Sequence, residues 1–92
     1  MSQPEKNEIL LTHVILMFQT AALQQMGKLK NPITDKVEKN LEMAQTSIDI
    51  LDMLFQKMKN NLSENENRMF VEVLKELKLN YVDEVAKEPK VN

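Results

Sequence analysis

Apolar residues recur in alternating steps of three and four between Leu41 and Leu62. This spacing is a heptad seam, which is typical of helices that pack against one another at shallow angles. It predicts a helix over residues 41–60, and Asn40 provides an N-cap oxygen just before it. The seam residues within this predicted helix are Leu41, Ala44, Ile48, Leu51, Phe55 and Met58.

A second amphipathic segment precedes this helix. Residues 8–26 predict a helix that ends at Gly27, because glycine is the residue best suited to a left-handed position after a helix. Its broad apolar face comprises Leu10, Leu11, Val14, Ile15, Met17, Phe18, Ala21, Ala22 and Met26. We expect this face to pack on the rest of the molecule.

A third predicted helix covers residues 64–86 and should end before Pro89. Its inner face comprises Met69, Phe70, Val73, Leu74, Leu77, Tyr81 and Val85. Because the connections are short, we predict an all-α, three-helix fold. The second and third helices form an antiparallel helical hairpin, and the apolar N-terminal helix packs across it.

The segment between the second and third helices carries the signals of a joint rather than of a ligand-binding loop. Ser63 and Glu66 have the S-x-x-E spacing of a capping box, which begins a helix. Asn60 and Asn61 suit the left-handed end of the preceding helix. At the ends of the chain, residues 1–7 and 87–92 predict a disordered tail and a frayed tail, which leaves one domain over residues 8–86.

The composition narrows the classes of function. The chain has 92 residues, 42% of them apolar and 28% charged, which fits one small globular domain. The net charge is −2 and the charges are interleaved, so no basic patch is present and nucleic acid is not expected as a partner. No cysteine is present, which excludes disulfides and Cys-ligated zinc. Polar residues such as Thr12 and Gln19 interrupt the apolar run of the first helix, so we expect a cytoplasmic protein rather than one that spans a membrane.

No group of residues indicates catalysis. His13 is the only histidine, and apolar residues occupy the positions one turn away that a second metal ligand would need. Asp49 and Asp52 share a polar helix face, where salt bridges are the expected role. A hydrogen bond between Asp49 and a neighbouring helix end is the special role we consider. A single glycine excludes a phosphate-binding loop. We predict no catalytic, cofactor-binding or metal-ligating residue and expect that the protein is not an enzyme.

Between Leu23 and Val82 four segments occur in a characteristic order: "MGKLKNP", "NLEMAQTSIDILDML", "KMKNNLSENE" and "YV". In these segments the chain resembles the small bacterial family called domain of unknown function 1844. That family often has glycine where Asp35 and Asn61 stand here. The resemblance implies a small helical bacterial protein and implies no particular activity.

The predicted helices carry more apolar surface than three packed helices of this length require. The first helix has a second apolar stripe, and the second has an apolar arc over about half of its circumference. Because small monomers rarely expose large apolar patches, we predict a homo-oligomer, most simply a dimer, that acts as a protein–protein interaction module for an unidentified partner. The predicted interface residues are Ile9, Leu16, Leu23, Met43, Ile50 and Leu54. The alternatives are a peripheral membrane protein and a carrier of small apolar ligands.

Overall fold

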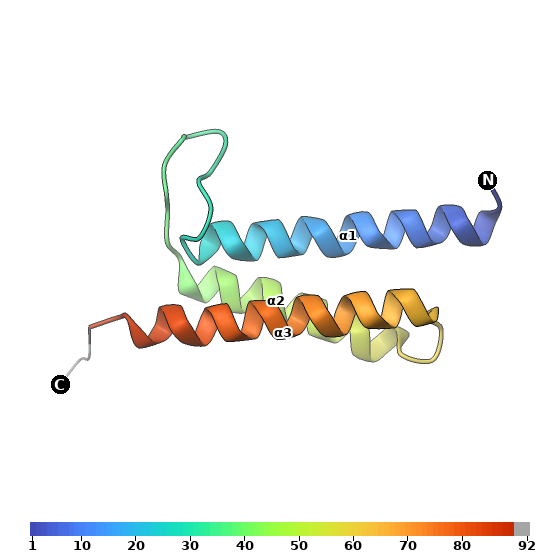
Figure 1. Cartoon of the computed structure of the whole chain (residues 1–92). Helices are drawn as coiled ribbons and strands as arrows, with labels where there is room; N and C mark the ends of the chain where they lie inside the picture. Colours follow the sequence, from blue (N-terminus) through green and yellow to red (C-terminus); the bar gives the residue numbers. More distant parts are fainter. Residues whose placement is uncertain (90–92) are drawn as a thin grey trace.

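A computed structural model describes residues 1–89 of the chain, and it contains three α-helices (Figure 1). They are α1 (Gln3–Gln25), α2 (Leu41–Met58) and α3 (Glu64–Ala86). The described residues form no β-strand beyond isolated bridges in one loop. The all-α, three-helix prediction is therefore confirmed.

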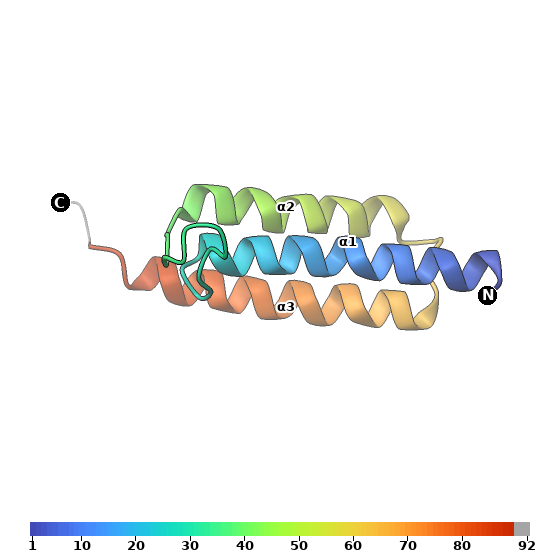
Figure 2. The same ribbon diagram turned by 90° about the horizontal axis from the view of Figure 1, so that it is seen from above.

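The helices are arranged as a hairpin with a third helix laid lengthwise upon it. Helices α2 and α3 run antiparallel, and α1 lies over the groove between them, antiparallel to α2 and parallel to α3 (Figures 1 and 2). Each pair of helices is in contact. The side of α1 that faces away from the hairpin therefore has no helix packed on it.

The heptad seam of α2 forms the centre of the core. Ala44, Ile48 and Leu51 are fully or almost fully buried, and they face buried Phe70 and Leu77 from α3. The rings of Phe55 and Phe70 stack with their centroids 5.3 Å apart. The other buried apolar residues are Ile15, Ala22, Met26, Val73 and Leu74. The predicted seam therefore packs as expected.

Helix α1 begins five residues earlier than the predicted start at Glu8, so the prediction of a disordered tail over residues 1–7 was wrong. Ser2 is the N-cap, and its Oγ accepts a hydrogen bond from the backbone N–H of Glu5. Pro4 lies in the first turn, where its missing N–H costs nothing because that group has no partner within the helix. At the other end, α3 stops at Ala86 as predicted, and residues 90–92 of the predicted frayed tail lie outside the described residues.

The joints follow the predicted chemistry at two points and differ at a third. Gly27 has φ of +81°, the left-handed conformation expected after α1. The Ser63–Glu66 capping box forms with reciprocal hydrogen bonds of 2.8 and 3.1 Å. Asn60 and Asn61 do not adopt positive φ; among the described non-glycine residues only Asp35 does, with φ of 57°. This left-handed conformation is the one that glycine adopts without strain, which agrees with the glycine that the resemblance implies at this position.

Three residues predicted to face inward are exposed instead. Leu10 and Met17 are left uncovered because α1 carries apolar residues on more of its circumference than the groove can cover. Val85 lies in the last turns of α3, where the side chain that contacts the loop between α1 and α2 is its neighbour Glu84, so Val85 itself is exposed. There Glu84, and not Val85, is the buried side chain.

Candidate functional site

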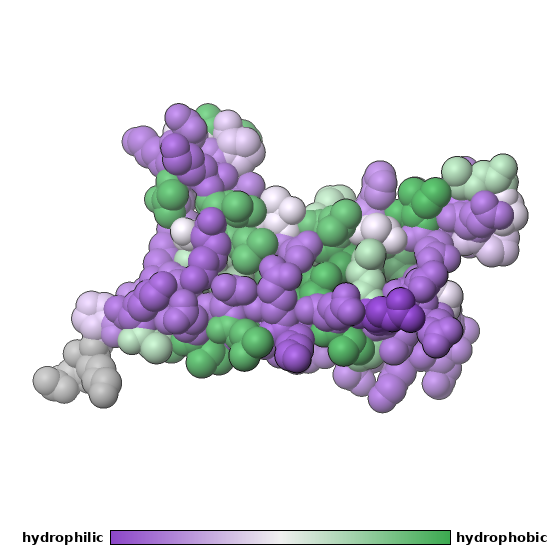
Figure 3. Space-filling model, viewed as in Figure 1, coloured by the Kyte–Doolittle hydropathy of each residue, from purple (hydrophilic) through white to green (hydrophobic). Residues whose placement is uncertain are grey.

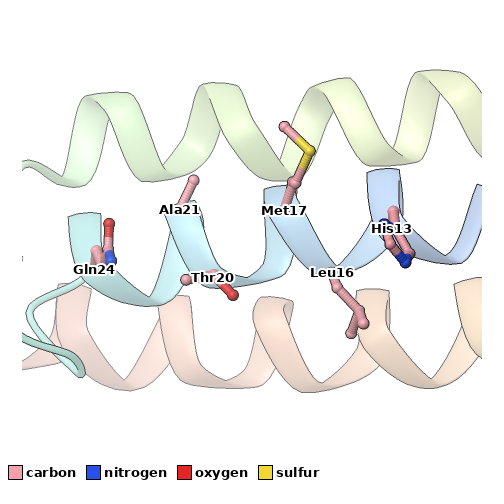
Figure 4. Close-up of a pocket in the computed structure, with 6 residues that line it drawn as sticks. All are labelled: His13, Leu16, Met17, Thr20, Ala21 and Gln24. Carbon is pink, nitrogen blue, oxygen red and sulfur yellow. The ribbon is translucent and has the colours of Figure 1, made fainter. Parts of the chain in front are cut away.

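The uncovered side of α1 carries a continuous band of side chains that we call the outer stripe. It consists of Ile9, His13, Leu16, Met17, Thr20 and Gln24. Apart from the adjacent pair Leu16 and Met17, successive positions are three or four residues apart, which places them on one face of a helix. Figure 4 shows most of this band: Met17 leans toward α2 and Leu16 toward α3, with His13 and Gln24 along the middle. Met17 is 67% exposed.

The outer stripe is a shallow surface and not an enclosed pocket. A depression of about 530 Å³ lies over it, and all six residues that line this depression come from α1 alone (Figure 4). One face of one helix provides a floor and no opposite wall. Sites for small ligands bury most of the ligand surface, so this geometry suits the surface of another macromolecule better than a small molecule.

Residues 26–40, here called the upright loop, stand beside the outer stripe. The loop rises from the C-terminal end of α1 on the side away from the hairpin (Figure 1). The space-filling view shows a hollow between this loop and the N-terminal end of α1, and apolar residues line the hollow (Figure 3). The outer stripe and the upright loop therefore form one surface.

The upright loop is held by hydrogen bonds at its base and near its tip. At the base, the Asn40 N–H donates to the Gln25 carbonyl oxygen over 2.7 Å. Near the tip, the Asn31 N–H donates to the Lys36 carbonyl oxygen over 2.8 Å, and the Asn31 side-chain oxygen accepts from the Ile33 N–H. Ile33 is nevertheless 92% exposed. The loop thus presents an apolar side chain from an ordered backbone.

A cluster of charges, here called the Glu84 clasp, ties the upright loop to α3. The Glu84 carboxylate lies 2.8 Å from Lys28 Nζ and 3.2 Å from Lys39 Nζ, both on the loop. Lys87 Nζ, one turn further along α3, is 2.8 Å away. Asp83 also pairs with Lys28 and Lys87. Two loop cations therefore share an acidic group that is itself largely buried, which fixes the position of the base of the loop.

The clasp predicts a specific dependence of stability on pH. Hydrogen bonds from Lys28 and then Lys87 favour the ionised carboxylate and lower the pKa of Glu84 from 4.5 to about 2. Because the pKa is depressed in the folded protein, the stabilisation by Glu84 is complete above pH 4.5 and is lost as the pH falls toward about 2. We expect Glu84→Gln to be less stable than the wild type at pH 7, with the difference closing over this interval. Urea unfolding at a series of pH values measures it.

Glu72→Gln is the matched control, since Glu72 is exposed on the same helix and forms no ion pair with another described residue. Its stability should follow that of the wild type at every pH. A Glu84→Gln curve parallel to the wild-type curve from pH 7 to pH 2 would show that Glu84 has no special interaction in the folded state.

The residues predicted for an oligomer interface do not share one surface. Ile9 and Leu16 lie in the outer stripe and are 44% and 45% exposed. Met43 is exposed on α2, and Ile50 is half-buried. Leu23 and Leu54 are half-buried and pack in part against the core within the chain; their place at an interface stays a prediction. Helix α1 lies over the groove, where it covers part of the second helix's wide apolar arc.

The polar residues considered in the sequence analysis are either exposed or bonded to other residues of the chain. His13 is exposed within the outer stripe. The Asp49 side chain accepts a hydrogen bond from Gln45 in the same helix, so the considered bond to a neighbouring helix end is not formed. Asp52 pairs with Lys78 of α3 over 3.3 Å. Within the described part of the chain, His, Cys, Asp and Glu side chains form no group of three that could hold a metal ion.

Two parts of this surface were missed from the sequence. Ile33 looks like one apolar residue in a polar turn, and nothing in its neighbours indicates that it is displayed at the tip of an ordered loop. Glu84 was overlooked because its partners Lys28 and Lys39 are remote in the sequence and meet it only through the fold. Met17 could have been found, since it falls on the same helix face as His13 and Thr20.

The comparisons with known proteins identify a family. A family model described as a domain of unknown function (DUF1844) matches residues 8–83, which is most of the chain. The chain belongs to the DUF1844 family. The match to this family model confirms the resemblance found in the sequence. Searches of the curated proteins and of the solved structures gave no match to this DUF1844 chain. Among residues 1–89, no helix is both long enough and apolar enough to cross a bilayer.

Proposed function

We propose that this DUF1844 protein is a non-catalytic protein–protein interaction module of the bacterial cytoplasm. Its first partner is a second copy of itself, in a two-fold dimer formed through the outer stripe of α1. The observation that carries this proposal is the amount of surface that one chain leaves uncovered.

The chain exposes 6667 Å² of surface. A compact monomer of 10.7 kDa exposes about 5,500 Å² according to the scaling of surface with mass. The radius of gyration is likewise large, 14.9 Å against about 12 Å for a compact domain of 92 residues. The excess of about 1,200 Å² exceeds the roughly 800 Å² that each partner buries in an interface of standard size. A dimer interface of standard size would therefore cover about two thirds of it.

The outer stripe is the surface best suited to this role. Ile9, Leu16 and Met17 are each between 44% and 67% exposed, and they lie within two turns of one another on α1. Contiguous apolar patches of this kind mark interaction sites on small soluble proteins. Methionine in such a patch also adapts its shape easily to a partner.

The charge on α1 favours a protein partner over a lipid surface. Helices that lie on membranes are rich in Lys and Arg beside their apolar face, because the lipid surface is anionic. Among residues 3–25, Lys6 is the single basic residue, and Glu5 and Glu8 carry negative charge nearby. The missing opposite wall of the outer stripe argues in the same way against a carrier of small apolar ligands.

Light scattering after size exclusion tests the proposal. At low micromolar concentration and physiological salt we expect a mass of twice 10.7 kDa. A mass of 10.7 kDa that persists up to the highest attainable concentration would refute the homodimer. The same samples, mixed with vesicles of anionic phospholipid and floated, should leave the protein in the unbound fraction.

A further inference from the structure

The positions of the outer stripe are arranged symmetrically along α1 about the centre of the stripe. Its most exposed apolar residues, Leu16 and Met17, are adjacent at the midpoint of the stripe. His13 and Thr20 lie at equal distances on either side of that midpoint. When two such helices pack antiparallel about a two-fold axis through the midpoint, the apolar centres meet each other. Each His13 then lies opposite a Thr20 hydroxyl of the other copy, a pair of groups that can share a hydrogen bond.

The upright loop selects between the two possible orientations. It stands at the C-terminal end of α1 and projects past the outer side of that helix (Figure 1). If two copies packed with their α1 helices parallel, both loops would project into the interface at the same end and would collide. In the antiparallel orientation each loop meets the opposite end of the other copy's α1, where no loop stands.

Individual charges of opposite sign can meet in the same orientation. Residues 26–40 contain four lysines against one aspartate and one glutamate. Lys30 and Lys36 form no ion pair with any other described residue, whereas the Glu84 clasp occupies the remaining two lysines. The first turns of α1 carry Glu5 and Glu8, with Lys6 between them. Antiparallel packing brings Lys30 and Lys36 of one copy near Glu5 and Glu8 of the other, where they can form ion pairs.

The exposed tip of the loop fits this geometry as well. Ile33 is 92% exposed although hydrogen bonds order the backbone around it. An apolar side chain held out from a fixed loop is positioned for contact with another surface. In the antiparallel pair that surface is the N-terminal part of the other copy's α1.

We propose that two copies pack antiparallel through α1, with the upright loop of each lying against the first turns of α1 in the other. This inference rests on the dimer proposed above and specifies its geometry. Residues at equal distances from the midpoint of the outer stripe face each other across the two-fold axis. In particular, Ile9 of each copy lies opposite Gln24 of the other.

Cysteine cross-linking tests this geometry, since the chain has no cysteine of its own. Ile9→Cys and Gln24→Cys are made separately, one of them with a tag that changes its mass. Each variant is first checked by light scattering, then treated with a short bismaleimide alone and as an equal mixture. We expect the mixture to yield cross-linked heterodimer on the order of tenfold more than the homodimer from either variant alone, because paired thiols react at a high effective concentration. Leu79→Cys, on the exposed side of α3, serves as the control and should not cross-link.

The outcomes separate the geometry from the dimer itself. Cross-linking of Ile9→Cys to itself would indicate parallel helices and would overturn the inference. A dimeric mass without cross-linking in the mixture would place the interface elsewhere and would overturn it too, while the proposed dimer would stand. A monomeric mass for the wild type and both variants would refute the proposed function.

Discussion

Replacing Phe70 by alanine is expected to lower the free energy of unfolding by about 3–5 kcal/mol, the range observed for large aromatic residues in protein cores. Phe70 is fully buried, and its ring stacks on Phe55 with 5.3 Å between centroids. A domain of 92 residues has about 5–14 kcal/mol of total stability at the usual value per residue. The variant should therefore lose a large part of its stability. Urea unfolding followed by circular dichroism measures the change.

Val71→Ala is the control for this variant. Val71 is the next residue of α3 and is 47% exposed, so its truncation should change stability by less than about 1 kcal/mol. Both variants must be measured at the protein concentration used for the wild type, because dimerisation makes apparent stability depend on concentration. Equal unfolding midpoints for the two variants would contradict the position of Phe70 at the centre of the core.

Leu16→Glu is expected to convert the dimer into a monomer that is still folded. Leu16 is 45% exposed in one chain, so a glutamate there remains solvated and leaves the core intact. In the proposed dimer the same position would lie at the two-fold axis, where two carboxylates would be desolvated close together. We expect the dissociation constant to rise about a hundredfold or more, which corresponds to about 2.7 kcal/mol. Sedimentation equilibrium measures the constant, and circular dichroism checks that the helix content is unchanged.

Leu79→Glu makes the same chemical change on the exposed side of α3, where Leu79 is 64% exposed. It should dimerise as the wild type does. If Leu79→Glu dissociated the dimer and Leu16→Glu did not, the interface would lie on α3 and not on the outer stripe.

The sequence predicted those features of the fold that depend on local chemistry. The seam from Leu41 to Met58 identified the buried face of α2, because a heptad pattern determines which side of a helix can pack. The Ser63 capping box and Gly27 marked helix ends correctly, since both act through hydrogen bonds and dihedral angles within a few residues. The start of α1 was missed because Pro4 was taken as a sign of disorder, although proline is well tolerated in a first helical turn.

The features that were missed depend on how the helices meet. Apolar residues surround almost the whole of α1, so its sequence could not show which of them the groove between α2 and α3 would cover. Leu23, predicted for an interface, packs in part against the core, whereas Met17, predicted to face inward, is 67% exposed. Nothing in the sequence indicated that Ser47 would be buried. It lies at the contact between α1 and α2, where its hydroxyl is 2.7 Å from the Gln25 side-chain amide.

Intermolecular nuclear Overhauser effects between isotope-labelled and unlabelled chains are the sharpest test of the proposed interface. They report which side chains of one copy lie within a few ångströms of another copy in solution. We expect such effects at the methyl groups of Leu16 and Met17, with none at Met53 of α2 or Val82 of α3. Intermolecular effects confined to Met53 or Val82, or none at a concentration where the measured mass is that of a dimer, would contradict the proposed interface.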